Sequence, residues 1–178
     1  MSPIVIDVDH SGFALTNAGS GAAFNILSDG VPLQLAWTAP GSTNALLVLD
    51  RNGNGTIDDG EELFGDNTPQ PASSTPNGFL ALAEYDKSGG GGNGNGRIDV
   101  QDAVFSQLRL WQDINHNGIS EPSELKPVAG MLSGIDLDYK LSKRTDQYGN
   151  EFRYRAKVYD VRGTQGGRWA WDVFLTYK

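Results

Sequence analysis

Short apolar stretches separated by Gly, Asn, Asp and Ser run along the whole chain. Residues 4–9 (IVIDVD) become alternating towards their end, and residues 13–16, 22–27 and 33–38 are brief apolar stretches, so each is predicted to form a strand. Residues 45–49 (ALLVL) are continuously apolar, which indicates a buried strand. The first part of the chain is therefore expected to contain several short strands.

Two short helices and one surface loop are predicted in the middle of the chain. Residues 68–77 contain three prolines and are expected to form a surface loop. One amphipathic helix is expected to begin after Asn77 and another near Asp99. Their apolar positions are Phe79, Leu80, Leu82 and Ala83 in the first, and Val104, Phe105 and Leu108 in the second.

The last part of the chain predicts an antiparallel β-hairpin. In residues 152–158 (FRYRAKV) apolar residues alternate with basic ones. Residues 169–175 (WAWDVFL) are similar, with Trp169, Trp171, Val173 and Leu175 on one face. Gly163 to Gly167 supplies the turn. We expect one apolar face and one basic face. The basic face is expected to be solvated, and the alternative is a face that binds an anion or a glycan.

Residues 50–61 (DRNGNGTIDDGE) fit the twelve-residue EF-hand calcium loop. The pattern places oxygen-bearing side chains at positions 1, 3, 5, 9 and 12, glycine at position 6, and a carbonyl ligand at position 7. Calcium is a hard cation that takes six to eight oxygens, which this spacing supplies. The alternative is a Gly/Asn-rich turn. The predicted ligands are Asp50, Asn52, Asn54, the carbonyl of Thr56, Asp58 and Glu61.

A second copy of the pattern covers residues 113–124 (DINHNGISEPSE). Position 8 is Ser120 instead of an aliphatic residue, which predicts weaker pairing with a partner loop. His116 stands at position 4 and is expected to be a bystander. Pro122 suits the first turn of a short exiting helix. The predicted ligands are Asp113, Asn115, Asn117, the carbonyl of Ile119, Glu121 and Glu124.

A third copy is altered at its beginning. The twelve-residue spacing puts Gly91 at position 1, where no side chain is available. Asp86 can serve instead if residues 88–92 are looped out as an insertion. The predicted ligands of this third site are Asp86, Asn93, Asn95, the carbonyl of Arg97, Asp99 and Asp102. Aspartate at the last position reaches less far than glutamate, so this site is expected to be the weakest.

Two partial copies lie closer to the N-terminus. Residues 7–12 (DVDHSG) keep the first half of the pattern, and residues 25–30 (NILSDG) have lost position 3. The first would need ligands from elsewhere in the chain to bind calcium, and the alternative is a turn with surface acids. The second is expected to be structural. Together the elements predict an α+β fold class, with short strands and short helices linked by calcium loops. Residues 1–141 are assigned to the loop region, and residues 142–178 to the basic hairpin of the same domain.

Composition and charge narrow the classes of function. The absence of cysteine excludes disulfides, zinc–thiolate sites and thiol nucleophiles. No apolar run approaches a membrane-spanning length. The net charge of −8 is divided unevenly, with 18 acidic and 5 basic residues (−13) in residues 1–138, against 4 and 9 (+5) in residues 139–178. This balance argues against nucleic acids and anionic membranes as partners. Eleven of the 22 acidic residues stand at ligand positions of the candidate calcium loops in residues 7–12, 50–61, 86–102 and 113–124.

Residues 46–68 (LLVLDRNGNGTIDDGEELFGDNT) and residues 108–125 (LRLWQDINHNGISEPSEL) resemble bacterial EF-hand-like calcium modules of large exported proteins, some of them of the RTX type. The resemblance covers about residues 3–141. Some such modules are self-processing, and calcium triggers cleavage of an Asp–Pro bond in them. None of the eight prolines of this chain follows Asp, and Ser2-Pro3 stands where that bond would lie. The resemblance therefore implies calcium binding without self-cleavage.

The sequence predicts a non-enzymatic, calcium-binding structural module with two calcium sites and a third altered one. We expect a monomer that is extracellular or at the cell surface as part of a longer exported protein, since the chain starts without the features of a signal peptide. One alternative is an adhesion module that binds a protein or glycan through the basic, Trp-bearing tail. A calcium-triggered self-processing domain is the third hypothesis.

Overall fold

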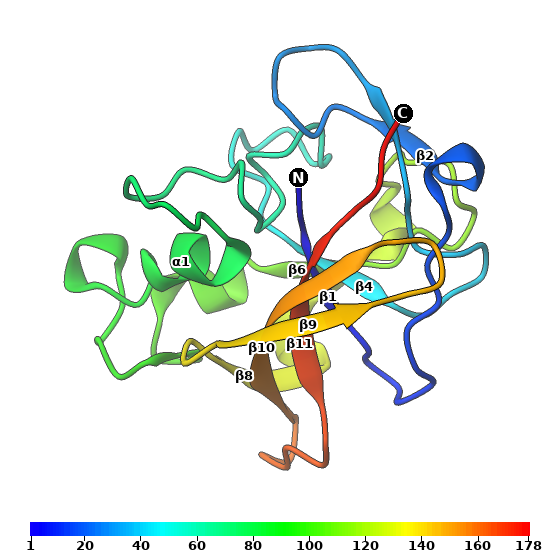
Figure 1. The fold of residues 1–178 in the computed structure, drawn as a ribbon. Coiled ribbons are helices and arrows are strands. Elements are labelled where there is room, and N and C mark those ends of the chain that lie inside the picture. Colours follow the sequence, from blue (N-terminus) through cyan, green and yellow to red (C-terminus); the bar gives the residue numbers. More distant parts are fainter.

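An antiparallel sheet of nine strands forms the frame of the molecule (Figure 1). The computed structural model describes residues 1–178. The strand order is β5-β8-β10-β11-β1-β4-β6-β7, and β9 pairs with β10 beside this path. The strands of the sheet are β1 (Ile4–Ile6), β4 (Ala45–Val48), β5 (Arg97–Asp99), β6 (Arg109–Trp111), β7 (Leu125–Pro127), β8 (Leu132–Asp136), β9 (Lys140–Thr145), β10 (Glu151–Asp160) and β11 (Trp169–Phe174).

The remaining elements are short. A separate two-stranded sheet pairs β2 (Ala22–Phe24) with β3 (Leu33–Leu35). The single α-helix, α1 (Gly78–Ala83), has six residues, and no helix is long and apolar enough to cross a bilayer. Five 3₁₀ turns complete the structure: η1 (Ala18–Ser20), η2 (Ser88–Gly90), η3 (Ala103–Ser106), η4 (Pro122–Glu124) and η5 (Val128–Gly130).

The predicted α+β fold class is wrong, because the chain is mainly antiparallel β structure with one short α-helix. The helix after Asn77 is confirmed, and the Asn77 side chain caps it by accepting hydrogen bonds from the N–H groups of Phe79 and Leu80. The helix expected near Asp99 is only the 3₁₀ turn η3, which β6 follows three residues later. In the first loop, the chain returns beside β4 through a Val48–Leu63 bridge instead of entering a helix.

The sheet is covered on both faces by apolar side chains. In β1, Ile4 and Ile6 belong to one buried cluster, and Val5 belongs to the other. Successive strand residues point to opposite faces, so this division follows from a continuously apolar strand. Phe79 of α1 packs into the first cluster and Phe24 of β2 into the second, and Figure 1 shows these elements on opposite sides of the sheet.

The C-terminal hairpin is confirmed, but its predicted division into an apolar and a basic face is wrong. Strands β10 and β11 pair antiparallel, with a register shift between Phe152 and Tyr154. Because a bulge changes which residues share a face, Phe152 joins the second cluster, whereas Tyr154 joins the first. Both faces of the hairpin are therefore apolar. Arg155 does not project into solvent alone, since its guanidinium lies 4.2 Å from the ring centroid of Trp169.

The hairpin is joined to the N-terminal strand. Strand β11 pairs with β1 through Val5 and Trp171, and β1 pairs with β4 through Val5 and Leu46. Residues from both predicted regions, 1–141 and 142–178, thus contribute strands to the same sheet. The sheet also positions the candidate loops, because the chain enters two of them directly from β4 and β6.

A fully buried carboxyl group lies inside β11. Asp172 Oδ2 accepts a hydrogen bond of 2.8 Å from the N–H of Gly78, and Oδ1 has no hydrogen-bond partner. A side chain cannot replace the hydrogen of Gly78, since a Cβ would lie 2.6 Å from Cγ1 of Ile4. Burial raises the pKa of Asp172 to about 7, although the hydrogen bond from Gly78 acts to lower it.

We expect the substitution Asp172→Asn to change how stability depends on pH. Between the ordinary aspartate pKa of 3.8 and the folded-state pKa of about 7, the folded protein keeps a proton that the unfolded chain has lost. The free energy of unfolding therefore falls as pH rises through this range, by about 3–4 kcal/mol in total. The Asn variant carries no such proton and should lack this decline, so its stability relative to the parent protein should rise with pH.

Urea unfolding at several pH values between 4 and 8 measures the difference. The exposed Asp138→Asn variant is the matched control, because it removes the same charge at a surface site. A stability difference between Asp172→Asn and the parent protein that stays constant across this pH range would contradict the expectation.

Candidate metal-binding loops

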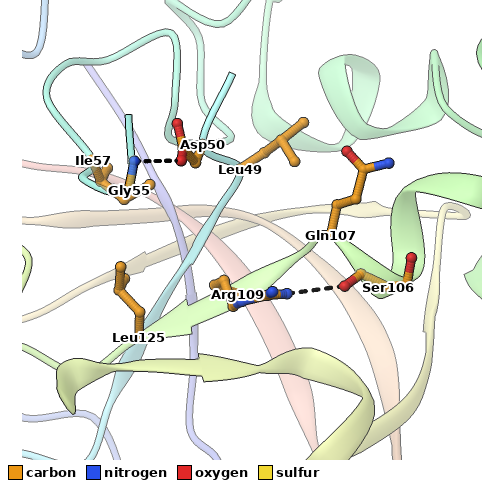
Figure 2. Close-up of a pocket in the computed structure, with 8 residues that line it drawn as sticks. All are labelled: Leu49, Asp50, Gly55, Ile57, Ser106, Gln107, Arg109 and Leu125. Carbon is orange, nitrogen blue, oxygen red and sulfur yellow. Dashed lines mark hydrogen bonds between the residues drawn. The ribbon is translucent and has the colours of Figure 1, made fainter. Parts of the chain in front are cut away.

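Three loops carry the acidic pattern found in the sequence, and each leaves a regular element of the fold. The first loop (residues 50–62) follows β4, the second loop (residues 113–124) follows β6, and the third loop (residues 86–102) follows α1. Figure 2 shows the start of the first loop, where Asp50 and Gly55 are joined by a hydrogen bond. The same bond recurs in all three loops.

The first acid of each loop holds the backbone of the turn. Its Oδ2 accepts a hydrogen bond of 2.8 Å from the glycine at position 6 in the pairs Asp50–Gly55, Asp113–Gly118 and Asp86–Gly96. Its Oδ1 accepts a bond of 3.1–3.2 Å from the N–H at position 5. The structure thus places Asp86 at position 1 of the third loop, and the turn η2 occupies most of the inserted segment.

A second acid in each loop has a buried side chain that accepts hydrogen bonds from both ends of the loop. These residues are Glu62, Glu124 and Asp102, with exposed fractions of 3, 7 and 2%. One oxygen of each accepts from the N–H at position 9, at 2.7, 3.4 and 2.9 Å respectively. The other oxygen accepts from an N–H at the start of the loop, at 3.0, 3.2 and 3.4 Å. The two acids together replace regular secondary structure as hydrogen-bond partners of these backbones.

Glu62 is the residue that sequence reasoning missed. The strict twelve-residue spacing selects Glu61, but the side chain of Glu61 is exposed and makes no hydrogen bond. Glu62 takes the same place in the first loop as Glu124 in the second. The sequence contains one hint of this, because an acid at residue 62 is followed directly by the apolar pair Leu63-Phe64, both buried.

The side chains at positions 3, 5 and 9 converge in the first two loops. Asn52 and Asn54 donate to Asp58 Oδ2 at 3.2 and 2.6 Å. The second loop repeats this arrangement, with Asn115 and Asn117 donating to Glu121 Oε1 at 3.2 and 2.8 Å.

The third loop differs at these positions. Asn93 donates to Gln101 instead of Asp99, and the guanidinium of Arg97 pairs with Asp136 at 3.0 Å. In the first loop, the hydroxyl of Thr56 also donates to Asp58, whereas in the second the side chain of Ile119 is exposed. The third loop therefore shares the backbone anchors but lacks the convergent side chains.

The loop acids differ in their proton affinity because their surroundings differ. Hydrogen bonding, chiefly from Asn54, lowers the pKa of Asp58, and hydrogen bonding, chiefly from Asn117, lowers that of Glu121. Burial raises the pKa of Glu62, and burial together with the neighbouring Glu121 raises that of Glu124. Each of these two loops thus combines an acid whose ionised form is favoured with a buried acid whose charge is costly.

The second loop is connected to the aromatic core. The indole N–H of Trp37 donates to Asp113 Oδ2 at 2.8 Å, and that of Trp111 donates to Glu124 Oε2 at 3.2 Å. The two indole rings contact each other, with centroids 5.5 Å apart. Both acids of the second loop therefore accept hydrogen bonds from fully buried tryptophans.

The first and second loops also touch each other. The N–H of Ile57 donates to the hydroxyl of Ser120 at 2.7 Å, and these residues hold position 8 of their loops. His116 has a positive φ of 59°, and its ring nitrogens lie 2.7 and 2.8 Å from the carbonyl oxygens of Thr38 and Ser20. His116 thus connects the second loop to the segments on either side of the β2–β3 hairpin.

A hollow of about 340 Å³ lies beside the first loop (Figure 2). The guanidinium of Arg109 donates to the backbone oxygens of Ser106 and Leu108, and Asp50, the only carboxylate of the lining, is already bonded within its loop. No three His, Cys, Asp or Glu side chains lie close enough to hold a metal ion by themselves. A cation in any loop would also need amide and backbone oxygens.

A family model described as "SPM domain" matches residues 4–175. The chain belongs to the SPM domain family. This SPM domain is 36% identical over 166 residues to the iron-regulated protein FrpA of Neisseria meningitidis serogroup C. The match covers 91% of this chain and 14% of FrpA, so the chain corresponds to one segment of a much longer bacterial protein.

The substitution Glu62→Gln tests the anchoring role of the second acid. Both oxygens of Glu62 accept backbone N–H groups, so an amide in either orientation turns its NH₂ towards a donor. We expect Glu62→Gln to lower the free energy of unfolding by about 1–3 kcal/mol in chelator-containing buffer. Glu61→Gln, which removes a neighbouring exposed charge, should change it by less than about 0.5 kcal/mol. Equal effects of the two substitutions in denaturant titrations would contradict the assignment.

Proposed function

We propose that this SPM domain is a non-enzymatic, calcium-binding structural module of a longer exported bacterial protein. One observation carries the proposal. The first and second loops, which are far apart in the sequence, have the same two-acid anchor and the same convergence of positions 3, 5 and 9. Calcium binding gives both loops a common reason to keep oxygen-bearing side chains at these positions.

Calcium matches the chemistry of these loops. It takes six to eight oxygen ligands at flexible geometry, and carboxylates, Asn amides and backbone carbonyls are its usual ligands. The oxygen and nitrogen of an Asn amide exchange places by rotation, so Asn52 and Asn54 can present oxygens to a cation that lies beside Asp58. In the first loop we propose Glu62 as the closing ligand in place of Glu61, because the side chain of Glu62 faces the loop interior.

The third loop is proposed as a weaker site. Its anchors Asp86 and Asp102 are in place, but Asn93 is bonded to Gln101, and Asp102 is shorter than the glutamates of the other loops. Two filled sites would change the formal charge from −8 to −4. The excess of acidic residues in residues 1–138 is then explained by cation binding, so it gives no reason to expect a basic partner on this part of the chain.

We propose that calcium has a structural role and that the module binds it outside the cell. The two loops connect β4, β6 and the β2–β3 hairpin through Ile57, Ser120 and His116, so ordering them orders the contacts between the two sheets. Binding to the folded state alone stabilises that state by mass action. Extracellular calcium modules work with dissociation constants of about 10⁻⁴ to 10⁻³ M, which fits an exported parent protein.

The tryptophans favour this proposal over glycan adhesion. Trp37, Trp111 and Trp171 are 1, 0 and 5% exposed, and Trp169 packs beside them against the second core cluster. The three buried rings have no free face for stacking on a sugar, and the guanidinium of Arg155 lies 4.2 Å from the ring centroid of Trp169. The adhesion alternative therefore loses the aromatic platform on which it depended.

Calorimetric titration with calcium tests the proposal directly. We expect two ions per chain with similar affinity and a third that binds more weakly, and each of Asp50→Asn and Asp113→Asn should remove one ion.

Calcium should raise the unfolding temperature relative to chelator. Because the second loop contacts two indole rings, tryptophan emission should respond to calcium in the parent protein but not in Asp113→Asn. Asp138→Asn serves as the control for lost charge. Identical unfolding temperatures with calcium and with chelator would refute the proposal.

Calcium-dependent self-cleavage is the activity that would distinguish the enzymatic alternative from the proposed structural module. Ser2 is buried, and its N–H donates to Asp66 at 2.7 Å. Serine at this position lacks the carboxylate that would attack its own carbonyl carbon in the Asp–Pro route. We expect the mass of the chain to stay unchanged after incubation with millimolar calcium, as measured by mass spectrometry. A new fragment that depends on calcium would show that the module is catalytic.

A further inference from the structure

Four basic residues on β9 and β10 have no acidic partner. The ion pairs of the structure involve Met1, Lys87, Arg97, Lys140 and Arg153 as the cations. No side-chain hydrogen bond is donated by the remaining basic residues of the two strands either. These unpaired residues are Lys143, Arg144, Arg155 and Lys157.

The two arginines are held in place by aromatic rings. The guanidinium carbon of Arg144 lies 4.4 Å from the ring centroid of Phe152, and that of Arg155 lies 4.2 Å from the ring centroid of Trp169. Both are also 5.4 Å from the ring of Trp171, so the two groups share one platform. Stacking fixes a guanidinium but leaves its N–H edge free. The pair therefore offers oriented, unused donors.

The platform adjoins an open sheet edge. Strand β9 pairs only with β10, and Figure 1 shows the β9–β10 pair at the front of the sheet. Five of its six residues are exposed, including Leu141 at 68%. A hollow of about 400 Å³ runs along the strand and is lined by residues 141–145 together with Glu151 and Arg153. An unpaired edge of this kind can accept an extended peptide through main-chain hydrogen bonds.

The positive charge of β9 and β10 determines which kind of partner can bind at this edge. A second copy of β9 would bring its own Lys143 and Arg144 against the same residues, and like charges oppose such pairing. Nucleic acids and anionic membranes would meet the −13 charge of residues 1–138 as well as the basic strands. A short peptide with spaced carboxylates avoids both conflicts, because the one carboxylate in the lining of the hollow, Glu151, is paired with Arg153. Carboxylates also bind guanidinium groups in a bidentate geometry.

We propose that the β9 edge, together with Arg144 and Arg155, binds an extended, carboxylate-rich segment of a partner protein. The peptide adds a strand to β9, and its acidic side chains on one face meet the two stacked guanidinium groups. This interaction is independent of calcium in the loops, because none of the residues involved belongs to them.

Fluorescence anisotropy with short labelled peptides tests the proposal. The probe is a peptide of alternating Glu and Val, compared with the matched Gln/Val peptide and with a Glu/Val peptide that is N-methylated at alternate residues. We expect the Glu/Val peptide to bind at least about tenfold more tightly than either comparison peptide, because only it combines carboxylates with free main-chain donors. Binding should weaken as salt is raised.

Variants locate the site. The double variant Arg144→Gln/Arg155→Gln should weaken binding of the Glu/Val peptide about tenfold or more. Lys126→Gln/Arg162→Gln removes the same charge elsewhere and should leave binding unchanged. Arg144→Lys/Arg155→Lys keeps the charge and serves if the Gln variant fails to fold; it should also bind more weakly, since lysine cannot form the bidentate contact.

Several results would overturn the proposal. They are equal binding of the Gln/Val or N-methylated peptide, an unaffected double variant, and tighter binding of a single-stranded oligonucleotide, a sulfated oligosaccharide or vesicles of anionic lipid. Self-association, detected as a concentration-dependent mass in sedimentation that increases in the double variant because like charges are removed from the edge, would assign the edge to a second copy instead.

Discussion

Buried carboxylates that accept backbone hydrogen bonds hold this protein together where regular secondary structure is missing. Long segments between the strands are rich in Gly and Asn and form neither helix nor ladder. Their N–H groups still require partners, and paired acids such as Asp50 with Glu62 provide them from inside the loop. The carboxylates have two oxygens with several lone pairs each, which allows one side chain to anchor two or three amides at once.

The same arrangement couples the loops to the core. Asp113 and Glu124 accept hydrogen bonds from Trp37 and Trp111, which belong to the cluster on one face of the large sheet. A change in the charge or position of either acid therefore reaches the packed aromatic side chains directly. The acids proposed to bind calcium are therefore in direct hydrogen-bond contact with the aromatic core.

The basic tail also acquires a physical explanation. A bulge in β10 places Phe152 on one face and Tyr154 on the other, so the strand contributes to both apolar clusters. Arginines of β10 cover rings of β11, as Arg153 does over Phe174 and Arg155 does over Trp169. Their stems bury apolar surface while their charged ends stay at the surface. The positive charge of residues 139–178 is thus partly a cover for aromatic residues, and only its unpaired part is available to a partner.

The sequence by itself determined the features that depend on neighbouring residues. The three loop patterns, the helix capped by Asn77 and the C-terminal hairpin all follow from spacing and alternation, which act over a few residues. Only the tertiary structure decided what these elements pack against. The expected α+β arrangement is wrong because the segment after Asp99 forms only the 3₁₀ turn η3, and the chain after the first loop pairs with β4 instead of entering a helix. Glu62 closes the first loop instead of Glu61 because it is the side chain that faces inward once Leu63 returns beside Val48, a contact that no local pattern contains.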